Sequence, residues 1–409
     1  MSGQAWLGLA LVLVGGLLSA PVVVLLGLAG LLVEVVRSVG ARRGLRDVVY
    51  ERRLGRDKAV VGDEIPLAVS AWNRTRLPLA WLRADDQASP GVVLRERELE
   101  AAEGGGQALR NAWTLAPFER VTRRFTIVAD RRGVFGLGPV TLRAGDLFAG
   151  VAGTVEVPGS ERYLVRPRAV PVHGLGQPPR WGGIERARRG LFENPALFAG
   201  VREYQPGDPL RRIHARTSAR LGRPVTKRYE PAREREVLVA LDLQTVSGPA
   251  WQPSFDEEAV EDLCVAAASI ARALHADGAA FGLAAAAYSG SLQPIAYLPP
   301  AEAPGQLERV LDLLARLSSH PSRPFEMLLS GLLRRLRPGA TVLVLTARDP
   351  APFLPTLRRM SRLGYGVVVL GCGASGAEHA ARARSVGLRG RVASLEGGWR
   401  TASRLTVVG

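Results

Sequence analysis

The most constraining feature of this 409-residue chain is an uncharged stretch near its N-terminus. The 29 residues 5–33, AWLGLALVLVGGLLSAPVVVLLGLAGLLV, contain no charged side chain. About 20 apolar residues are enough for a helix to cross the core of a bilayer. Pro21 would interrupt one long helix because proline removes a backbone donor. We therefore expect residues 1–38 to be a transmembrane anchor, either one long tilted span or, as we favour, two short helices at 3–19 and 21–37.

Basic residues follow this stretch and predict an orientation. Cytoplasmic flanks of membrane spans carry an excess of Lys and Arg. Only Glu34, Asp47 and Glu51 oppose the basic residues here. We expect the bulk of the chain to be cytoplasmic for either number of spans. The basic residues are Arg37, Arg42, Arg43, Arg46, Arg52 and Arg53.

Residues 39–165 have the pattern of a β-domain. Short runs such as EIPLAVSAW and RVTRRFTIVAD alternate apolar and polar positions and are separated by turn residues. Strands that recur every 8–12 residues are typical of a sandwich. The sequence therefore predicts a β-sandwich domain.

The pattern of apolar and polar residues changes in residues 236–409. VLVALDL, TVLVLTAR and YGVVVLGC are continuous apolar runs, as in buried parallel strands. Amphipathic segments of helical length, such as PGQLERVLDLLARLSS, separate them. This alternation predicts an α/β domain with a mostly parallel sheet.

Between these two domains, residues 166–235 form an arginine-rich segment with 16 basic and 6 acidic residues. The whole chain carries a net charge of +16, so most of the excess is concentrated here. QPGD at 205–208 fits a type II turn. Asp208 would then cap a helix that starts at Pro209 and ends before Gly222. Its apolar face would consist of Leu210, Ile213, Thr217 and Leu221.

Another face of this predicted helix carries Arg212, Arg216 and Arg220 at four-residue spacing. Such a column costs roughly 0.2–0.5 kcal/mol per pair unless anions neutralise it. We favour internal neutralisation by nearby carboxylates. Recognition of an acidic partner or phospholipid heads is the second interpretation, and nucleic acid is the weakest because no aromatic residues are interleaved for base stacking. The nearby carboxylates are Glu203, Glu230, Glu234 and Glu236.

The segment resembles a bacterial family, the domain of unknown function 58 family. The matching positions are Arg202, Glu203, Tyr204, Gly207, Asp208, Arg211 or Arg212, Ile213, Ser218, Ala219 and Arg220. The resemblance implies a two-helix membrane anchor, a β-domain and a C-terminal domain similar to von Willebrand factor A. It also implies a bacterial cell-membrane protein that works with a MoxR-type AAA+ ATPase. Ala215 stands where the family usually has Trp.

A von Willebrand A domain can hold Mg²⁺ at the carboxyl edge of its sheet through Asp-x-Ser-x-Ser. Asp242 stands at the first position, but Gln244 and Val246 replace the serines. Ala347 stands where a carboxylate could follow a later strand, and Asp349 is displaced. We predict a degenerate site without a metal cofactor, which only the shifted Thr245 and Ser247 could restore.

No catalytic signature occurs in the sequence, and His214 has no carboxylate at helical spacing to orient it. We therefore expect no enzymatic activity and interpret the chain as an interaction or scaffold protein. The alternatives are a binder of anionic lipid or nucleic acid and, last, a metal-dependent enzyme or ligand binder. We predict that Arg202, Glu203, Tyr204, Gly207, Asp208, Arg212, Ile213, Arg216, Ser218 and Arg220 contact the partner.

Overall fold

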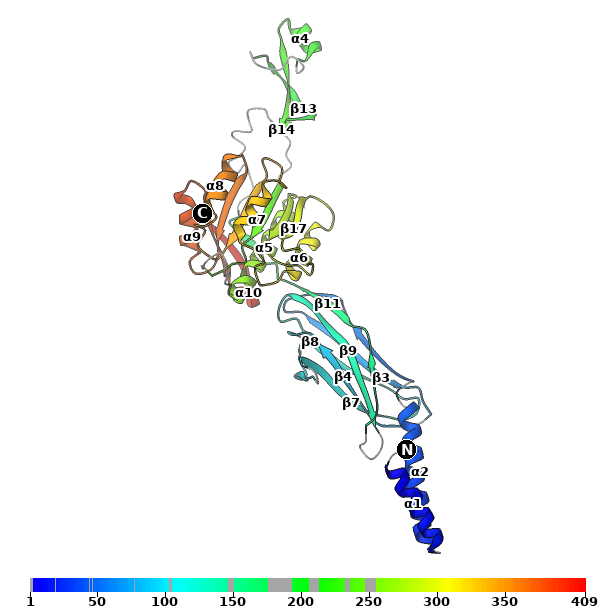
Figure 1. The fold of residues 1–409 in the computed structure, drawn as a ribbon. Helices are drawn as coiled ribbons and strands as arrows, with labels where there is room; N and C mark the ends of the chain where they lie inside the picture. The colour runs from blue at the N-terminus through cyan, green and yellow to red at the C-terminus, as the bar shows by residue number, and fades with distance from the viewer. Residues whose placement is uncertain are drawn as a thin grey trace. The chain divides into compact units, whose positions relative to one another are not determined.

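A computed structural model of the protein describes residues 3–18, 20–43, 45, 47–76, 78–102, 105–145, 151–175, 193–205, 213–231, 236–246 and 255–409. The chain divides into two units, Met1–Arg166 and Pro167–Gly409. Figure 1 shows the elements of both units along the chain.

The first unit begins with two helices, α1 (Gly3–Leu17) and α2 (Pro21–Arg43). Pro21 is the first residue of α2, where its missing N–H costs nothing. The predicted pair of helices is thus confirmed, although α2 extends six residues beyond the expected 37. Among the residues that the structure describes, no helix combines the length and the apolarity that crossing a membrane requires.

Glycines bring these two helices close together. A Cβ at Gly27 would lie 2.7 Å from the backbone nitrogen of Val12, and one at Gly15 would lie 2.8 Å from that of Val24. Such distances leave no space for a side chain. The outward faces are apolar, and Leu17 is 84% exposed. The pair therefore packs through small residues and presents aliphatic side chains outward.

The rest of the first unit is a β-sandwich, as predicted. One sheet has the order β1-β3-β8-β5 and the other β2-β11-β9-β4-β7-β6, with β10 paired to β9. Ile65, Leu67 and Val69 alternate inward along β3, and Leu67 lies opposite Phe125 of β8. The strands are β1 Val48–Leu54, β2 Lys58–Val60, β3 Glu64–Asn73, β4 Leu79–Ala88, β5 Val93–Leu94, β6 Glu100–Ala101, β7 Gln107–Leu115, β8 Arg120–Val128, β9 Gly133–Gly145, β10 Val151–Val157 and β11 Glu161–Arg166.

The second unit contains an α/β domain whose sheet has the order β12-β21-β20-β19-β18-β15-β16-β17. The central strands are parallel, whereas β17 and β21 run antiparallel to their neighbours β16 and β20. The predicted mostly parallel sheet is confirmed. The strands are β12 Val172–His173, β15 Glu236–Leu241, β16 Ala280–Ala285, β17 Ala296–Ala301, β18 Thr341–Thr346, β19 Gly366–Gly371, β20 Arg389–Glu396 and β21 Arg404–Val408.

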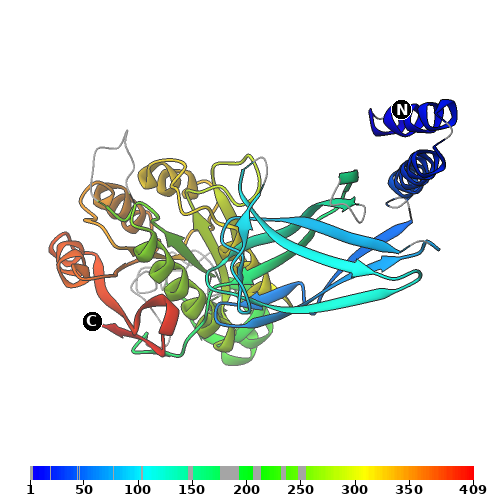
Figure 2. The same cartoon turned by 90° about the horizontal axis from the view of Figure 1, so that it is seen from below.

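Helices surround this sheet, as Figure 2 shows from below. Phe325 of α7 and Leu357 of α8 belong to one buried cluster with Leu238 of β15 and Val344 of β18. β19 is buried at every position, as expected for a strand covered on both faces. The helices are α5 Glu257–Ala276, α6 Gln306–Arg316, α7 Phe325–Leu332, α8 Leu354–Arg362, α9 Gly376–Ser385 and α10 Gly398–Thr401.

Candidate functional site

The family-motif residues lie on a small hairpin of the second unit. Strand β13 (Glu193–Glu203) pairs antiparallel with β14 (Val225–Pro231), and the short helix α4 (Ala215–Leu221) lies between them in the chain. The Nδ1 atom of His214 accepts a hydrogen bond from the backbone N–H of Thr217 at 3.2 Å. His214 is therefore the N-cap of α4, and Gly222 ends the helix in the left-handed conformation with φ of 65°.

The predicted single helix through residues 213 and 214 was wrong, because α4 begins only at Ala215. The predicted helix start at Pro209 lies outside the described residues, as does Leu210. Ile213 instead forms a β-bridge with Thr226, and the N–H of His214 donates to the carbonyl of Val225 at 2.9 Å. These pairings keep the chain extended up to the cap. The expected apolar face therefore does not form a single helical stripe.

Side chains and backbone groups hold α4 against β14. The Ser218 hydroxyl accepts a hydrogen bond from the N–H of Val225 at 3.0 Å. The N–H of Tyr204 donates to the carbonyl of Pro224 at 3.1 Å, which joins the end of β13 to the start of β14. Since α4 buries none of its residues, these polar contacts rather than a core position the helix.

The structure brings six of the ten predicted motif residues together on the hairpin and α4 and one at the bridge before the helix. Arg202 and Glu203 end β13, with Tyr204 directly after them. The hairpin and helix thus hold Arg202, Glu203, Tyr204, Arg216, Ser218 and Arg220, and the bridge holds Ile213. The predicted turn and the sites Gly207, Asp208 and Arg212 lie outside the described residues.

The charges on this element are only partly neutralised. Glu203 forms an ion pair with Arg223, which is not a member of the predicted arginine column. Glu236 pairs instead with Arg337, at 3.1 Å. Within the described parts of the chain, neither Arg216 nor Arg220 has a carboxylate partner, and both are exposed. We call these two side chains the arginine face.

The second place of interest is the carboxyl edge of the α/β sheet. Asp242 directly follows β15 and is 1% exposed. The Nε atom of Arg348 donates to its Oδ2 at 2.9 Å, and the Thr346 hydroxyl donates to the same oxygen at 3.0 Å. The N–H of Gln244 donates to Oδ1 at 3.3 Å. Protein donors thus bind both oxygens of the buried carboxylate.

Burial dominates the electrostatics of this carboxylate. It raises the pKa of Asp242 to about 6, although the Arg348 guanidinium and the hydrogen bonds act in the opposite direction. Arg348 is itself buried, with its NH2 group 3.5 Å from Glu326 at the start of α7. The guanidinium also lies 5.4 Å from the centre of the Phe353 ring. The arginine is therefore held between the sheet edge and α7.

These residues do not fit a magnesium site. The Thr245 hydroxyl, one of the two shifted candidates, accepts a hydrogen bond from the N–H of Asp256 at 2.7 Å rather than facing Asp242. Asp349 forms an ion pair with Arg382. Among the described residues, no group of three or more His, Cys, Asp or Glu side chains could hold an ion. Ser247 lies outside the described residues.

Arg348 is a residue of this edge that could not be identified from the sequence. A carboxylate was expected near Ala347 or Asp349, and the arginine lies between these two positions. A basic residue two positions after a buried strand was the available signal. Its pairing with Asp242 could not be predicted, since the two are 106 residues apart in the chain.

These elements define a multidomain protein in which a helix pair and a β-sandwich precede an α/β domain consistent with a von Willebrand factor A-like fold. Residues 200–353 match the family described as "Protein of unknown function DUF58". The match confirms the resemblance stated from the motif and covers residues 200–353 of the chain.

A curated relative and two solved structures complete the comparison. "Uncharacterized protein YeaD" of Bacillus subtilis is 23% identical over 253 residues, which are 61% of this chain and 59% of the relative's length. A CARDB domain from Pyrococcus furiosus is 12% identical, with a TM-score of 0.20 over 29% of this chain and 87% of that one. A cohesin module from Clostridium perfringens is 11% identical, with a TM-score of 0.21 over 29% and 97%. At such TM-scores neither likeness bears on the fold.

Proposed function

We propose that this protein is a membrane-anchored docking platform whose bulk lies in the cytoplasm and which works with a MoxR-type AAA+ ATPase in the assembly or maturation of protein complexes. It binds its partner and carries out no chemistry of its own. The arginine face of α4 is the centre of the docking surface, and the helix pair is the anchor.

The observation that carries this proposal is the pair Arg216 and Arg220. Both guanidiniums are exposed on one side of α4, without a carboxylate partner among the described residues. Like charges four residues apart on a helix are unfavourable unless an anion neutralises them. Arginine binds carboxylates with two parallel hydrogen bonds. An acidic protein surface therefore supplies what the isolated helix lacks.

The helix pair supports the anchoring part of the proposal. No charged side chain occurs in residues 5–33, and Leu7, Leu13 and Leu26 are each more than 60% exposed. Aliphatic side chains in such numbers on the outside of a helix pair are costly in water. A bilayer removes this cost when the pair enters it as a hairpin, and the arginines that follow favour the cytoplasmic side.

The carboxyl edge of the sheet supports docking that needs no metal ion. A von Willebrand A domain that binds through Mg²⁺ presents its carboxylates to the ion. Here the positive charge beside Asp242 is the guanidinium of Arg348, which donates a hydrogen bond to the carboxylate. We therefore place the docking surface on α4 rather than at this edge.

Cross-linking in native membranes, followed by identification of the co-purified proteins, tests the proposal. We expect the wild-type chain to capture an AAA+ ATPase and the Arg216→Glu/Arg220→Glu variant to lose it. Arg358→Glu/Arg359→Glu on α8 is the matched control, since both arginines are exposed and it changes the charge by the same amount. Capture that is equal in all three proteins would contradict the proposal.

Salt dependence separates this function from polyanion binding, which is the second candidate. Affinity for nucleic acid or anionic lipid that rests on phosphate contacts falls steeply with ionic strength. We expect partner capture to persist at about 0.5 M salt, where contacts driven by phosphate charge are largely lost. If the chain captures only lipid or nucleic acid, and high salt abolishes this capture, polyanion binding is the better description of its function.

A further inference from the structure

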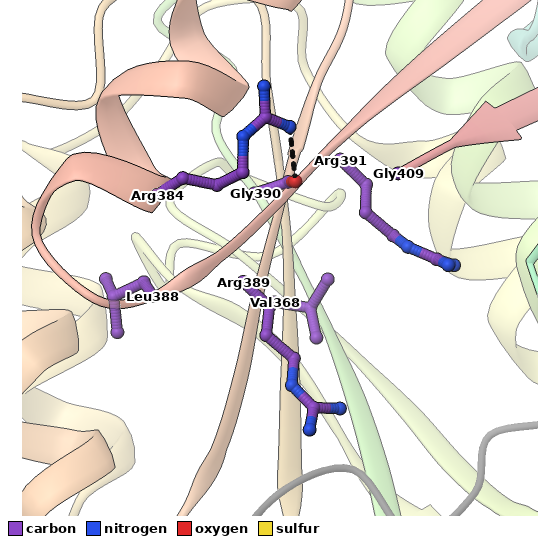
Figure 3. Close-up of a pocket in the computed structure, with 7 residues that line it drawn as sticks. All are labelled: Val368, Arg384, Leu388, Arg389, Gly390, Arg391 and Gly409. Carbon is purple, nitrogen blue, oxygen red and sulfur yellow. Dashed lines mark hydrogen bonds between the residues drawn. The ribbon is translucent and has the colours of Figure 1, made fainter.

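The pocket in Figure 3 lies beside β19 and β20 of the α/β domain and has a volume of about 400 Å³. Two of its arginines already bond to the protein. Arg384 donates to the carbonyl of Gly390 at 2.9 Å, and Arg391 donates to that of Leu175 at 3.0 Å. The aliphatic lining residue Leu388 is 6% exposed, so little apolar surface faces the hollow. We therefore assign no ligand to this pocket.

One turn of the β-sandwich holds an exposed aromatic residue in an unfavourable backbone conformation. Phe118, in the loop between β7 and β8, has a φ of 59° and is 60% exposed. Among the residues that the structure describes, it is the only one other than glycine with a positive φ. The left-handed region is costly for a bulky side chain, and burial in the core does not offset the cost here. Neither packing nor backbone preference explains this residue.

The sandwich fixes this turn at both ends. The N–H of Glu119 donates to the carbonyl of Ala116 at 3.2 Å, which closes a β-turn with Phe118 at its third position. Glycine is preferred at that position when φ is positive. The side chain of the buried Asn73 donates to the carbonyl of Ala116 at 3.0 Å, and its N–H donates to that of Glu119 at 2.9 Å. The phenyl ring is therefore presented outward by a turn that β3 holds in place.

This end of the sandwich is also where the chain arrives from the helix pair. The N–H of Arg74, which follows Asn73, donates to the carbonyl of Asp47 at 3.1 Å. Asp47 lies four positions after Arg43, the last residue of α2. Four residues span at most about 14 Å. Phe118 thus lies at the end of the sandwich that the chain tethers closely to the helix pair.

Two tryptophans lie at the same end as the turn. Trp72 is opposite Arg120 near the end of β3, and Trp81 is opposite Gly145 near the start of β4. Both are half-buried. The guanidinium of Arg74 lies 4.0 Å from the centre of the Trp72 ring. Such aromatic residues, with arginines beside them, are typical of protein surfaces at the level of lipid headgroups.

The charges of this end are balanced. Arg74 and Arg76 are exposed, and neither has a carboxylate partner in the described part of the chain. Asp47 and Glu119 are exposed at the same end, and Glu119 accepts a hydrogen bond from the N–H of Ala116 at 2.6 Å. Two cations and two anions leave little net charge. An attraction of this surface to a bilayer would therefore come from its aromatic rings.

We propose that this end of the β-sandwich lies against the lipid bilayer, with the ring of Phe118 inserted at the level of the headgroups and with Trp72 and Trp81 beside it. Insertion removes the apolar surface of the ring from water, which offsets the strain of the turn. The inference rests on the anchoring part of the proposed function, because the helix pair brings this end to the membrane. It adds a second membrane contact, made by the folded domain itself.

Spin labels test this contact in the full 409-residue chain, reconstituted in vesicles of phosphatidylcholine and phosphatidylglycerol. One cysteine is introduced at a time: Ala116→Cys in the turn, Val93→Cys and Leu26→Cys. Val93 pairs with Val128, at the opposite end of β8 from the turn, and Leu26 is exposed on the helix pair. Both native cysteines are buried and should stay unlabelled. Collisions with oxygen, which concentrates in the bilayer, are compared with collisions with a water-soluble nickel complex.

We expect the label at position 26 to collide mainly with oxygen and the label at position 93 mainly with the nickel complex. The label at position 116 should be shifted from the value at 93 towards the value at 26. Because the contact is aromatic rather than ionic, raising the salt concentration should leave this shift unchanged.

Phe118→Asn is the decisive variant because asparagine tolerates a positive φ but has no apolar ring. We expect it to return the label at 116 to the value at 93 without lowering the midpoint of thermal unfolding, which loss of a merely structural residue would lower. Phe118→Trp should keep the shift, since indole is favoured at the headgroups. Val93→Asn, which removes an exposed apolar side chain at the opposite end, is the control and should keep it too.

The labels separate failure of this inference from failure of the anchor. If the label at 116 is as exposed to water as that at 93 while the label at 26 lies in lipid, the inference is wrong and the anchor stands. Exposure to water at all three positions would contradict both. An unchanged shift in Phe118→Asn, or a shift that high salt abolishes, would also overturn the assignment to the ring.

Discussion

Asp242 and Arg348 are 106 residues apart in the chain and share one buried hydrogen bond. Moving either charge out of water is costly, and their mutual attraction offsets this cost only while both are present. Thr346 and Gln244 donate two further hydrogen bonds to the carboxylate. At this edge of the sheet, the guanidinium of Arg348 thus neutralises the carboxylate of Asp242.

Loss of the arginine should be more harmful than loss of the whole pair. Arg348→Met leaves an unpaired buried carboxylate, which we expect to cost about 3–5 kcal/mol of unfolding free energy. The double variant Asp242→Asn/Arg348→Met removes both charges and should cost clearly less. Denaturant unfolding followed by circular dichroism measures both values. A cost below about 1 kcal/mol for the single variant would show that the pair contributes little.

The pKa of Asp242 predicts a pH dependence with a definite sign. Burial raises it from 3.8 to about 6, so between these values the folded protein binds more protons at this site than the unfolded chain does. The contribution of Asp242 to stability is therefore fully present below about pH 4 and lost as the pH rises through 6, by up to roughly 3 kcal/mol.

Asp242→Asn isolates this effect from other titrating groups, since asparagine does not ionise. The unfolding free energy of the wild type minus that of the variant should fall between pH 4 and pH 7. Denaturant titrations at a series of pH values provide the difference. A difference that stays level, or rises, over this range would refute the assignment of a raised pKa.

At the scale of elements, α4 is a short helix fastened by polar contacts, with no buried residue of its own. His214 caps its first turn, and Ser218 ties it to Val225 of β14. A helix of this length is not stable alone in water. Its position, and with it that of the arginine face, depends on these few hydrogen bonds.

Removing the cap should loosen α4 without unfolding the protein. We expect His214→Ala to reduce the local stability of residues 215–221 by about 0.5–2 kcal/mol, the usual effect of losing an N-cap. Amide hydrogen exchange of this helix measures the change. His214→Asn should restore protection because asparagine caps well. Equal protection in the wild type and the alanine variant would show that the cap does not hold the helix.

The helix pair offers a test of its glycine packing. Gly27→Leu should push α1 and α2 apart because any Cβ there meets the backbone of Val12 at 2.7 Å. Gly30→Leu is the matched control, since a Cβ at that position meets nothing within 4 Å. Spin labels at the exposed positions Leu7 and Leu32 should report a longer or broader distance in the first variant alone. Identical distances in both would contradict close packing.

The elements that could be predicted are those with local signals. Pro21 and the charge-free run predicted two N-terminal helices, and continuous apolar runs predicted the parallel strands. Pro209 and Asp208 gave an equally strong local signal for a helix that continues to residue 221, but Ile213 forms a bridge with Thr226 instead of continuing it. The strand order also could not be read locally, because β12 joins the sheet next to β21, more than 200 residues later.

The candidate sites also contain residues that a local sequence signal reveals and residues whose role depends on tertiary contacts. Asp242 was found because it directly follows an apolar strand, whereas Arg348 was missed because its role depends on a contact across the fold. The arginine column was visible in the sequence, but which members lack a partner depends on tertiary structure. Glu203 pairs with Arg223 rather than with Arg216 or Arg220.

At the scale of the whole molecule, each part has a separate task in the proposed function. In that proposal the helix pair is the anchor, the sandwich follows it as a folded domain, and the α/β domain carries a sheet edge where Arg348 pairs with Asp242. The hairpin with α4 presents the positive charge that the proposed partner recognises. The central claim is that this charge binds a protein rather than a polyanion.

The most direct test is a binding titration of the purified AAA+ partner against three forms of the full chain at about 0.15 M and about 0.5 M salt. The account predicts that Arg216→Glu/Arg220→Glu loses at least tenfold in affinity at both salt concentrations, while Arg358→Glu/Arg359→Glu binds as the wild type does. Equal affinity of all three forms, or equal losses in both variants, would contradict it.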